Sequence, residues 1–130
     1  MQEIYEFIKD CGVYYLATTD DNVPRVRPFG TIAIFENHLY IQTGKKKDVY
    51  KQIVKNNNVE LCAFKDGKWI RVSGMLIPDE REAAKKHMLD HYPELRGMYS
   101  EFDDNTIVLY FEKGKAIISS FTDENKVIEF

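Results

Sequence analysis

The stretch that decides the fold is Arg25–Ile53, RVRPFGTIAIFENHLYIQTGKKKDVYKQI, and it also carries the candidate site. Two β-rich runs, Arg25–Phe35 and Leu39–Thr43, are joined by Glu36-Asn37-His38, a loop short enough for a hairpin. The letters GKKK follow the second run, and a pattern with apolar residues at helical spacing begins directly after them. We therefore expect a β-hairpin that leads through a basic turn into a short helix.

This layout favours an anion site at the junction of strand and helix. Arg25 and Arg27 alternate with Val26, so both arginines project from one face of a strand. The junction brings Thr43 and the lysines at 45–47 beside the open N–H groups of a helix N-terminus, which attract phosphate. A solvated helix cap with two surface arginines is an equally good interpretation of the same spacing, because short basic runs are common.

Pro28 interrupts the first β run and predicts an edge strand or a bulge there, since proline cannot donate to a central ladder. Gly30 follows closely and allows something to approach the backbone. A ligand beside the strand and a plain barrel corner both remain compatible with this pair.

The rest of the chain predicts one mainly β domain over residues 1–130, with helices at its periphery. Many short β runs alternate with turn signals, and few segments show helical periodicity. We expect helices over 2–10, 48–56 and 80–91, with strands over 13–19, 59–64, 68–77, 106–112, 115–121 and 127–130. Asp66-Gly67 and Lys113-Gly114 are the expected hairpin turns in the second half.

The run 68–77 separates its side chains into two chemically different faces. Trp69 and Arg71 fall on one face, whereas Ile70 and Val72 fall on the other and are expected inside the barrel. A helix, a second subunit or a ligand must then cover the face of Trp69, unless it is a half-exposed tryptophan beside an arginine.

The helix expected over 80–91 has a capping pattern at its start, with Asp79 three residues before Glu82. Its two histidines, His87 and His91, share a face, so a metal pair is conceivable, but a solvated or partly packed face is favoured and no metal site is predicted. The irregular segment 92–104 is expected to be a functional or capping loop.

Composition narrows the possible partners. The net charge is −3, which disfavours a nucleic-acid partner, and a single-strand binder is therefore the weakest hypothesis. Cys11 and Cys62 lie among apolar residues and are expected to pack as free cysteines. No apolar run approaches the length of a membrane span, so we expect a cytoplasmic protein without a membrane partner.

Four segments in order, PRVRPF, LYIQTGKKKDVYKQI, VELCAF and KWIRVSG, resemble the pyridoxamine 5′-phosphate oxidase-like flavoproteins. The resemblance extends from CGVYYLATT near the start to AIISSF near the end, and is strongest to the small members related to nitroimidazole-resistance proteins. It implies a six-stranded split β-barrel that binds FMN and works as a homodimer.

The resemblance also implies roles for particular residues. The basic strand would reach the phosphate and the flavin edge, the end of the next strand would meet the ring and ribityl chain, and the lysine turn would hold the phosphate. A weaker implication is that a tryptophan and an arginine come from the partner subunit. The residues implied as cofactor-binding are Arg25, Val26, Arg27, Pro28, Gln42, Thr43, Lys46, Lys47, Trp69 and Arg71.

The chain departs from the family pattern at two places. Many relatives have Ser-Arg-Lys where this chain has Lys-Lys-Lys-Asp, so the lysine that would hold the phosphate is left open. The chain ends in DENKVIEF and lacks the Arg-Leu-x-Pro motif of true pyridoxamine phosphate oxidases, so oxidation of vitamin B6 is not expected.

The expected function is that of an FMN-dependent oxidoreductase that takes electrons from a small-molecule donor and reduces nitro, quinone or flavin-type acceptors. No arrangement for covalent catalysis is recognisable, and the catalytic residues stay open. A non-enzymatic carrier or sensor that holds a flavin or haem on the same barrel is the alternative.

Overall fold

The computed structural model describes all 130 residues, and its strands form one antiparallel sheet that curls around a core. The strands follow the order β2-β1-β5-β6-β7-β4-β3, and β8 pairs with β7. The elements are α1 (Gln2–Cys11), β1 (Tyr14–Asp20), β2 (Val23–Phe29), β3 (Ala33–Phe35), β4 (His38–Gly44), α2 (Asp48–Lys55), β5 (Asn58–Lys65), β6 (Lys68–Asp79), α3 (Glu82–His91), η1 (Pro93–Gly97), β7 (Thr106–Ser120) and β8 (Lys126–Glu129).

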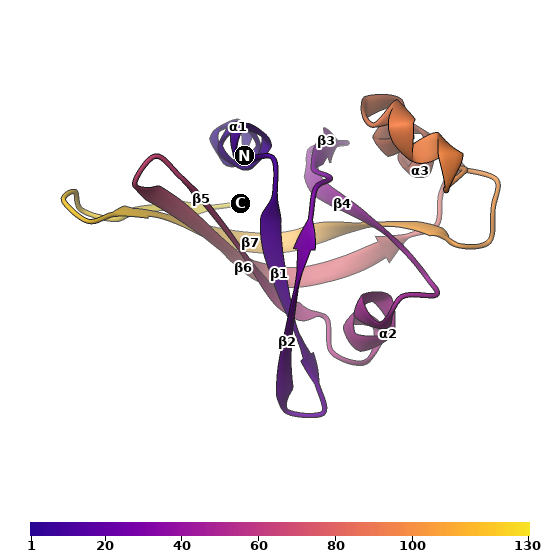
Figure 1. The fold of residues 1–130 in the computed structure, drawn as a ribbon, viewed down its shortest axis with the longest axis horizontal. Helices are drawn as coiled ribbons and strands as arrows, with labels where there is room; N and C mark the ends of the chain where they lie inside the picture. The colour runs from indigo at the N-terminus through magenta and orange to yellow at the C-terminus, as the bar shows by residue number, and fades with distance from the viewer.

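The predicted fold class is confirmed: the chain is a mainly β split barrel with peripheral helices, although it has eight strands rather than six. In Figure 1 the β1–β2 hairpin projects away from the rest of the sheet, and α2 lies beside it. α1 and α3 lie on the opposite side of the molecule from the hairpin tip. No helix is long and apolar enough to cross a membrane.

A core of 19 buried residues fills the barrel. The alternation predicted for β6 is confirmed, because Ile70, Val72 and Leu76 are fully buried. α1 and α2 each contribute their apolar side to the same core, and Val49 and Ile53 anchor α2 there. α2 is therefore held firmly where its N-terminus meets the end of β4.

Tight two-residue turns close three of the hairpins. In each turn both residues have positive φ: Asp21-Asn22, Glu36-Asn37 and Asp66-Gly67. This conformation matches the right-handed twist of the flanking strands and suits Asn, Asp and Gly. His38, predicted as part of the second turn, is instead the first residue of β4.

The β run predicted over Arg25–Phe35 is divided into β2 and β3, which pair with different neighbours. Between them, the Thr31 hydroxyl accepts a hydrogen bond from Gln42 N at 3.1 Å, and Tyr92 Oη bonds both N and O of Ile32. Side chains thus satisfy the backbone where the ladder ends. The prediction for Pro28 is confirmed, because β2 is an edge strand.

The hairpin predicted around Lys113-Gly114 is wrong, because β7 runs without interruption from Thr106 to Ser120. Gly114 lies opposite Gly74 of β6, next to a shift of register. A Cβ at Gly74 would collide with the carbonyl oxygen of Lys113, and one at Gly114 would collide with the ring of Phe130. The glycine permits close packing at a bend of the sheet, not a turn.

The capping role predicted for Asp79 is also wrong. α3 begins after Arg81 and has no side-chain cap. Asp79 is instead the buried last residue of β6, where it accepts hydrogen bonds from the Tyr40 hydroxyl and from Arg81. His87 of α3 bonds the carbonyl oxygen of Ile34 at 2.9 Å, so this part of the helix face is packed.

Candidate functional site

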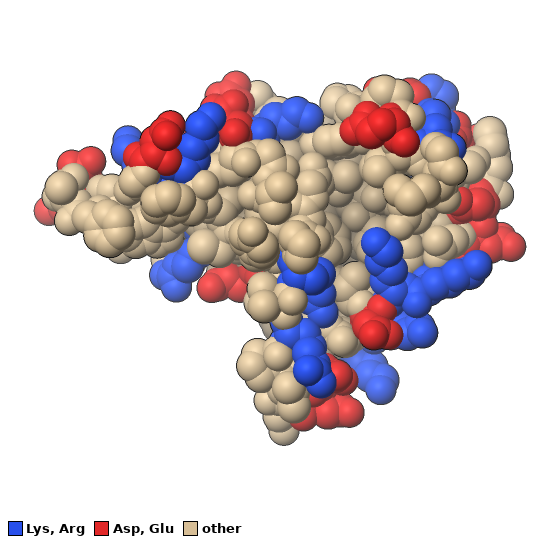
Figure 2. All heavy atoms as spheres, in the orientation of Figure 1, with Lys and Arg blue, Asp and Glu red and all other residues tan.

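A cavity of ≈ 420 Å³ opens where the end of β2, the end of β4 and the start of α2 meet the segment after α3. Figure 2 shows Lys and Arg side chains gathered on this side of the molecule, over the β1–β2 hairpin and beside α2. The lining residues are Arg27, Pro28, Phe29, Gly30, Thr31, Gln42, Thr43, Lys47, Val49, Tyr92, Glu94, Leu95, Met98 and Tyr99.

Arg27 is a partly buried cation at one end of this cavity. Its Nη1 donates to the carbonyl oxygen of Leu16 at 3.2 Å and to Thr18 Oγ1 at 2.7 Å. Its Nη2 donates to Gln52 Oε1 at 2.6 Å, and Thr18 Oγ1 donates to the same oxygen at 2.6 Å. The guanidinium is thus held from β1 and from α2 by three hydrogen bonds.

All three acceptors of Arg27 are neutral, and no carboxylate forms an ion pair with it. Burial lowers the pKa of Arg27 from its usual value, although the charge of Asp48 opposes this effect. The shift leaves the group positively charged at neutral pH, because arginine titrates far above it. Arg27 therefore brings to the cavity a positive charge that no ion pair within the chain neutralises.

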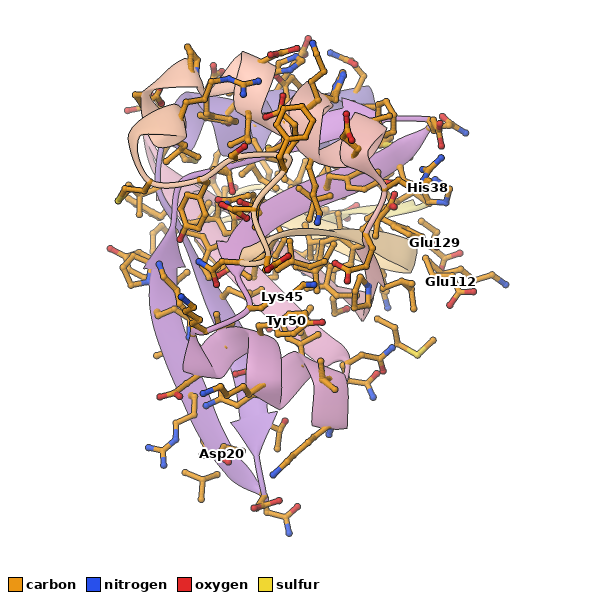
Figure 3. All side chains as sticks on the ribbon, turned by 90° about the vertical axis from the view of Figure 1, so that its right-hand side faces the viewer. Asp20, His38, Lys45, Tyr50, Glu112 and Glu129 are labelled. Atoms are coloured by element: carbon orange, nitrogen blue, oxygen red, sulfur yellow. The ribbon has the colours of Figure 1, made fainter.

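The lysine turn, residues 45–47, joins β4 to α2, and its three side chains have different surroundings. Lys45 Nζ donates to Glu80 Oε2 at 2.6 Å, which raises the pKa of Lys45. Figure 3 places Lys45 above the start of α2, close to Tyr50. Lys46 and Lys47 form no ion pair within the chain, and only Lys47 lines the cavity.

The loop before β7 fixes the backbone of the lysine turn. Asn105 accepts a hydrogen bond from Lys45 N through its carbonyl oxygen at 2.7 Å, and from Lys46 N through Oδ1 at 3.0 Å. A Cβ at Gly44 would approach the Asn105 amide to 2.8 Å, so glycine allows this close contact. Lys47 is the N-cap of α2 but provides no side-chain cap, which leaves the first N–H groups of the helix open to a ligand.

Gln42 and Thr43, at the end of β4, are buried and line the cavity. The Gln42 side chain donates to the carbonyl oxygen of Thr43 at 3.1 Å. The hydroxyl of Thr43 makes no hydrogen bond within the chain, and no buried side-chain atom lacks a partner, so this hydroxyl remains accessible from the cavity.

Sequence reasoning missed the far wall of the cavity. The segment 92–104 is predicted to be a functional or capping loop, without a site residue named in it, and this wall comes from Tyr92, Glu94, Leu95, Met98 and Tyr99. Their contacts with β2 and β4 are distant in sequence and leave no local pattern. A cluster of aromatic and apolar residues in a polar, irregular segment was the only available signal.

Five of the ten predicted site residues line the cavity, and five do not. Arg27, Pro28, Gln42, Thr43 and Lys47 line it. The five that are not among the lining residues are Arg25, Val26, Lys46, Trp69 and Arg71.

Each of these five has its own surroundings. Arg25 is paired in register with Thr18 on the face of Arg27, but its Nε lies 3.4 Å from Asp20. Lys46 is exposed beside the cavity. Val26, Trp69 and Arg71 lie on the outer face of the sheet.

The residues that line the cavity belong to the part of the chain that matches a known protein family. The family model described as pyridoxamine 5′-phosphate oxidase matches residues 1–118. The chain belongs to the pyridoxamine 5′-phosphate oxidase family. The resemblance inferred from the four sequence segments is thereby confirmed, and every residue that lines the cavity falls inside the matched range.

Solved structures with a similar fold agree with this assignment. A NimC/NimA family protein from Clostridium acetobutylicum has a TM-score of 0.97 and 40% sequence identity, and the match covers 100% of this chain and 92% of that chain. The General Stress Protein 26 from Bacillus anthracis has a TM-score of 0.74 at 18% identity and covers 98% of both chains.

A pyridoxamine 5′-phosphate oxidase-related, FMN-binding protein from Nostoc punctiforme has a TM-score of 0.62 at 14% identity. That match covers 97% of this chain and 90% of that chain. At these identities the Bacillus and Nostoc proteins show a shared fold. No curated protein sequence matches the chain.

Proposed function

We propose that the chain binds FMN and places its phosphate where β2, β4 and α2 meet. The observation that carries this proposal is Arg27, a partly buried guanidinium at the cavity that only neutral groups contact. A buried charge without a counter-ion is unfavourable, and a phosphate beside it would remove that cost. The similarity of the fold to an FMN-binding relative supports flavin as the ligand.

The other groups at this end of the cavity suit a phosphate as well. Lys47 lines the cavity, and Lys46 lies next to it without an ion pair. The open N-terminus of α2 adds N–H donors and the positive end of the helix dipole. Lys45 is the least suited lysine, because Glu80 already holds its ammonium group.

The remainder of the cavity suits the uncharged parts of a flavin. The accessible hydroxyl of Thr43 and the polar side chain of Gln42 are suited to hydrogen bonds with the ribityl chain or the ring. Leu95 and Met98 provide an apolar surface on the opposite wall that would exclude water from the ring. Bound FMN would supply electron transfer, and the residues of the chain would bind and orient it.

The proposed functional unit is a homodimer, because the outer face of the sheet carries apolar side chains that nothing covers. Tyr15, Phe64 and Phe121 are 54%, 61% and 84% exposed. Trp69 and Arg71 lie on the same face, opposite Phe64 and Cys62 of β5. A second copy that packs against this face would bury it and would bring its own Trp69 and Arg71 toward the flavin.

Sedimentation velocity at micromolar concentration tests the dimer. We expect a single species at twice the chain mass, and conversion to monomer when Phe64→Asp introduces a charge in the face. A wild-type protein that sediments only as a monomer would contradict the dimer and the contribution of Trp69 and Arg71, while the phosphate site on β2, β4 and α2 would be unaffected.

The proposed reaction is reduction of nitro, quinone or flavin-type acceptors by electrons from a small-molecule donor, through FMN. A non-enzymatic carrier or sensor that binds a flavin or haem is the alternative. Steady-state oxidation of NADH or NADPH with menadione as the acceptor distinguishes them: turnover supports the reductase, whereas tight binding without turnover supports the carrier.

The first experiment on the protein itself is a visible absorption spectrum of the purified chain, followed by titration of the flavin-free protein with FMN, riboflavin and haem. We expect flavin bands and a clear preference for FMN over riboflavin, since the two differ only in the phosphate. Equal affinity for the two flavins, or binding of haem alone, would contradict the phosphate site.

A further inference from the structure

The unneutralised charge of Arg27 depends on the chemical identity of one side chain, Gln52. This residue lies in α2, one helical turn after the residues that begin the helix, and it is not among the residues that line the cavity. Its Oε1 accepts from Arg27 Nη2 and from Thr18 Oγ1, both at 2.6 Å. These are among the shortest hydrogen bonds in the cluster, and they join α2 to both strands of the β1–β2 hairpin.

The hydrogen bonds themselves determine which way the Gln52 amide points. A guanidinium can only donate, so the atom facing Arg27 must be the amide oxygen. The Thr18 hydroxyl accepts from Arg27 Nη1 and therefore has its own proton available for the same oxygen. The amide nitrogen Nε2 of Gln52 makes no hydrogen bond within the chain. A carboxylate in this place would lose no donor that the fold uses.

We propose that Gln52 is a specificity-determining positioning residue, which holds Arg27 toward the cavity without neutralising it, so that the site selects a flavin that carries a phosphate. The proposal rests on the proposed function, because it concerns the same end of the cavity. A glutamate at this position would have nearly the same shape and could form the same two hydrogen bonds. It would also satisfy the charge of Arg27, which is then no longer available to an anionic ligand.

This role predicts opposite effects on folding and on binding. In the flavin-free protein, Arg27 is partly buried with only neutral partners, and Gln52→Glu would provide the missing counter-ion. Stability without ligand should therefore be kept or increased. Affinity for a phosphate group should fall, because the cation is already paired. A side chain with a purely structural role would instead lose stability and affinity together.

The test compares Gln52→Glu with the control Gln2→Glu, which makes the same chemical change at an exposed position of α1. Dissociation constants for FMN and for riboflavin are measured on flavin-free protein by quenching of flavin fluorescence. We expect Gln52→Glu to weaken FMN binding roughly 10- to 100-fold and to change riboflavin binding less than about twofold, as the loss of a charge-assisted contact to the phosphate alone would. Gln2→Glu should bind both flavins as the wild type does.

Thermal unfolding of the flavin-free proteins adds a readout that does not use the cofactor. Inorganic phosphate should raise the melting temperature of the wild type and of Gln2→Glu. It should have little effect on Gln52→Glu, whose melting temperature without phosphate should equal or exceed that of the wild type. A lower melting temperature together with weaker binding of both flavins would overturn the proposal, because it would indicate a structural role.

A second variant, Gln52→Met, separates orientation from charge. It removes the acceptor oxygen but leaves Arg27 without a counter-ion, so we expect the preference for FMN over riboflavin to fall less than in Gln52→Glu. An equal fall in both variants would show that neutrality is not the selected property and would overturn the proposal. If wild type itself prefers FMN to riboflavin but Gln52→Glu keeps that preference, the inference fails while the proposed function stands. If wild type has no preference, the proposed function fails.

Discussion

Arg27 and Arg81 are the two arginines with the most hydrogen bonds in the chain, and their surroundings are opposite. Arg81 donates to both carboxylate oxygens of Asp79, at 3.1 Å from Nε to Oδ1 and 2.9 Å from Nη2 to Oδ2. It also donates to both oxygens of Glu36, at 3.1 and 2.7 Å. Arg27 meets a carbonyl, a hydroxyl and an amide instead.

The difference separates a structural arginine from one that is available to a ligand. Arg81 links the turn before β4, the end of β6 and the start of α3, and its charge is fully neutralised there. Hydrogen bonds to Asp79 and then to Glu36 raise the pKa of Arg81, whereas burial lowers the pKa of Arg27, which has no acid as a hydrogen-bond partner. An arginine whose charge is already satisfied stabilises the fold, and one whose charge is left open is suited to bind an anion.

Removal of Arg27 should have the largest effect, and that effect should be a loss of affinity for FMN. Arg27→Met keeps an apolar stem of similar length and removes the charge. We expect affinity for FMN to fall roughly 100-fold, because more than one charge-assisted hydrogen bond to the phosphate is lost. Riboflavin affinity and the melting temperature should change little. Isothermal titration with both flavins measures the effect.

Arg25→Met is the matched control, because Arg25 lies on the same strand face but beside Asp20 and away from the cavity. Its effect on FMN affinity should stay below about threefold, as is usual for an exposed charge. Equal losses in the two variants would mean that general positive charge on the hairpin attracts the flavin, and that the position of Arg27 is not special.

Removal of Arg81 should lower the stability of the fold and leave the affinity for FMN unchanged. In Arg81→Met the carboxylate of Asp79, whose side chain is only 6% exposed, keeps the Tyr40 hydroxyl as its one side-chain donor. We expect the melting temperature to fall by roughly 5 °C, and the effect is moderated because the Arg81 side chain is 53% exposed and water already screens its charge. FMN affinity of the folded protein should equal that of the wild type. A variant with normal stability and weak FMN binding would reverse the comparison.

Much of the fold could be predicted because its determinants are local. The alternation around Ile70 and Val72 and the turn residues Asp66-Gly67 fix strand faces and hairpins within a few residues of chain. Lys113-Gly114 gave the same kind of local signal but a different outcome. Gly114 is required because the ring of Phe130, at the end of the chain, packs where a Cβ would be. A turn pattern does not reveal a contact between residues so far apart in sequence.

The site was predictable only where the sequence places charge close together. Arg27 and Lys47 both belong to the stretch that defines the hairpin and helix, so the cationic end could be anticipated. The wall opposite depends on Tyr92, whose hydroxyl bonds Ile32 and also accepts from Lys9 Nζ at 3.1 Å. These residues meet only after α3 packs on the sheet. Whether Lys45 was free could not be known either, because Glu80 reaches it from beyond β6.

The three lysines of the turn should contribute unequally, with effects smaller than that of Arg27. Lys47→Ala should weaken FMN binding roughly 10-fold, because this side chain lines the cavity. Lys46→Ala should cost about threefold, since an exposed charge acts through solvent. Lys45→Ala should change affinity less than about twofold, because its ammonium group is held by Glu80. Fluorescence titration of the three variants measures the order, and a dominant Lys45 would contradict it.

The smallest expected effect is a difference in the response to acid. Burial alone raises the pKa of Asp79, but hydrogen bonds from Arg81 and Tyr40 outweigh it and lower the pKa below its ordinary value. A carboxylate with a lowered pKa stabilises the fold above the pKa of the unfolded chain, and this contribution is lost as the pH falls through the folded pKa. For this group, melting temperatures should therefore stay nearly constant from pH 7 down to about pH 4, the ordinary pKa of an aspartate, and decline as the pH falls further. In Arg81→Met burial dominates and the pKa of Asp79 rises above its ordinary value, so the contribution of this group changes sign. The folded state then holds the proton more tightly than the unfolded chain does, and for this group the melting temperature should rise, not fall, as the pH drops through the raised pKa. Parallel curves for the wild type and Arg81→Met would mean that Arg81 does not keep Asp79 charged, and the contrast with Arg27 would then rest on geometry alone.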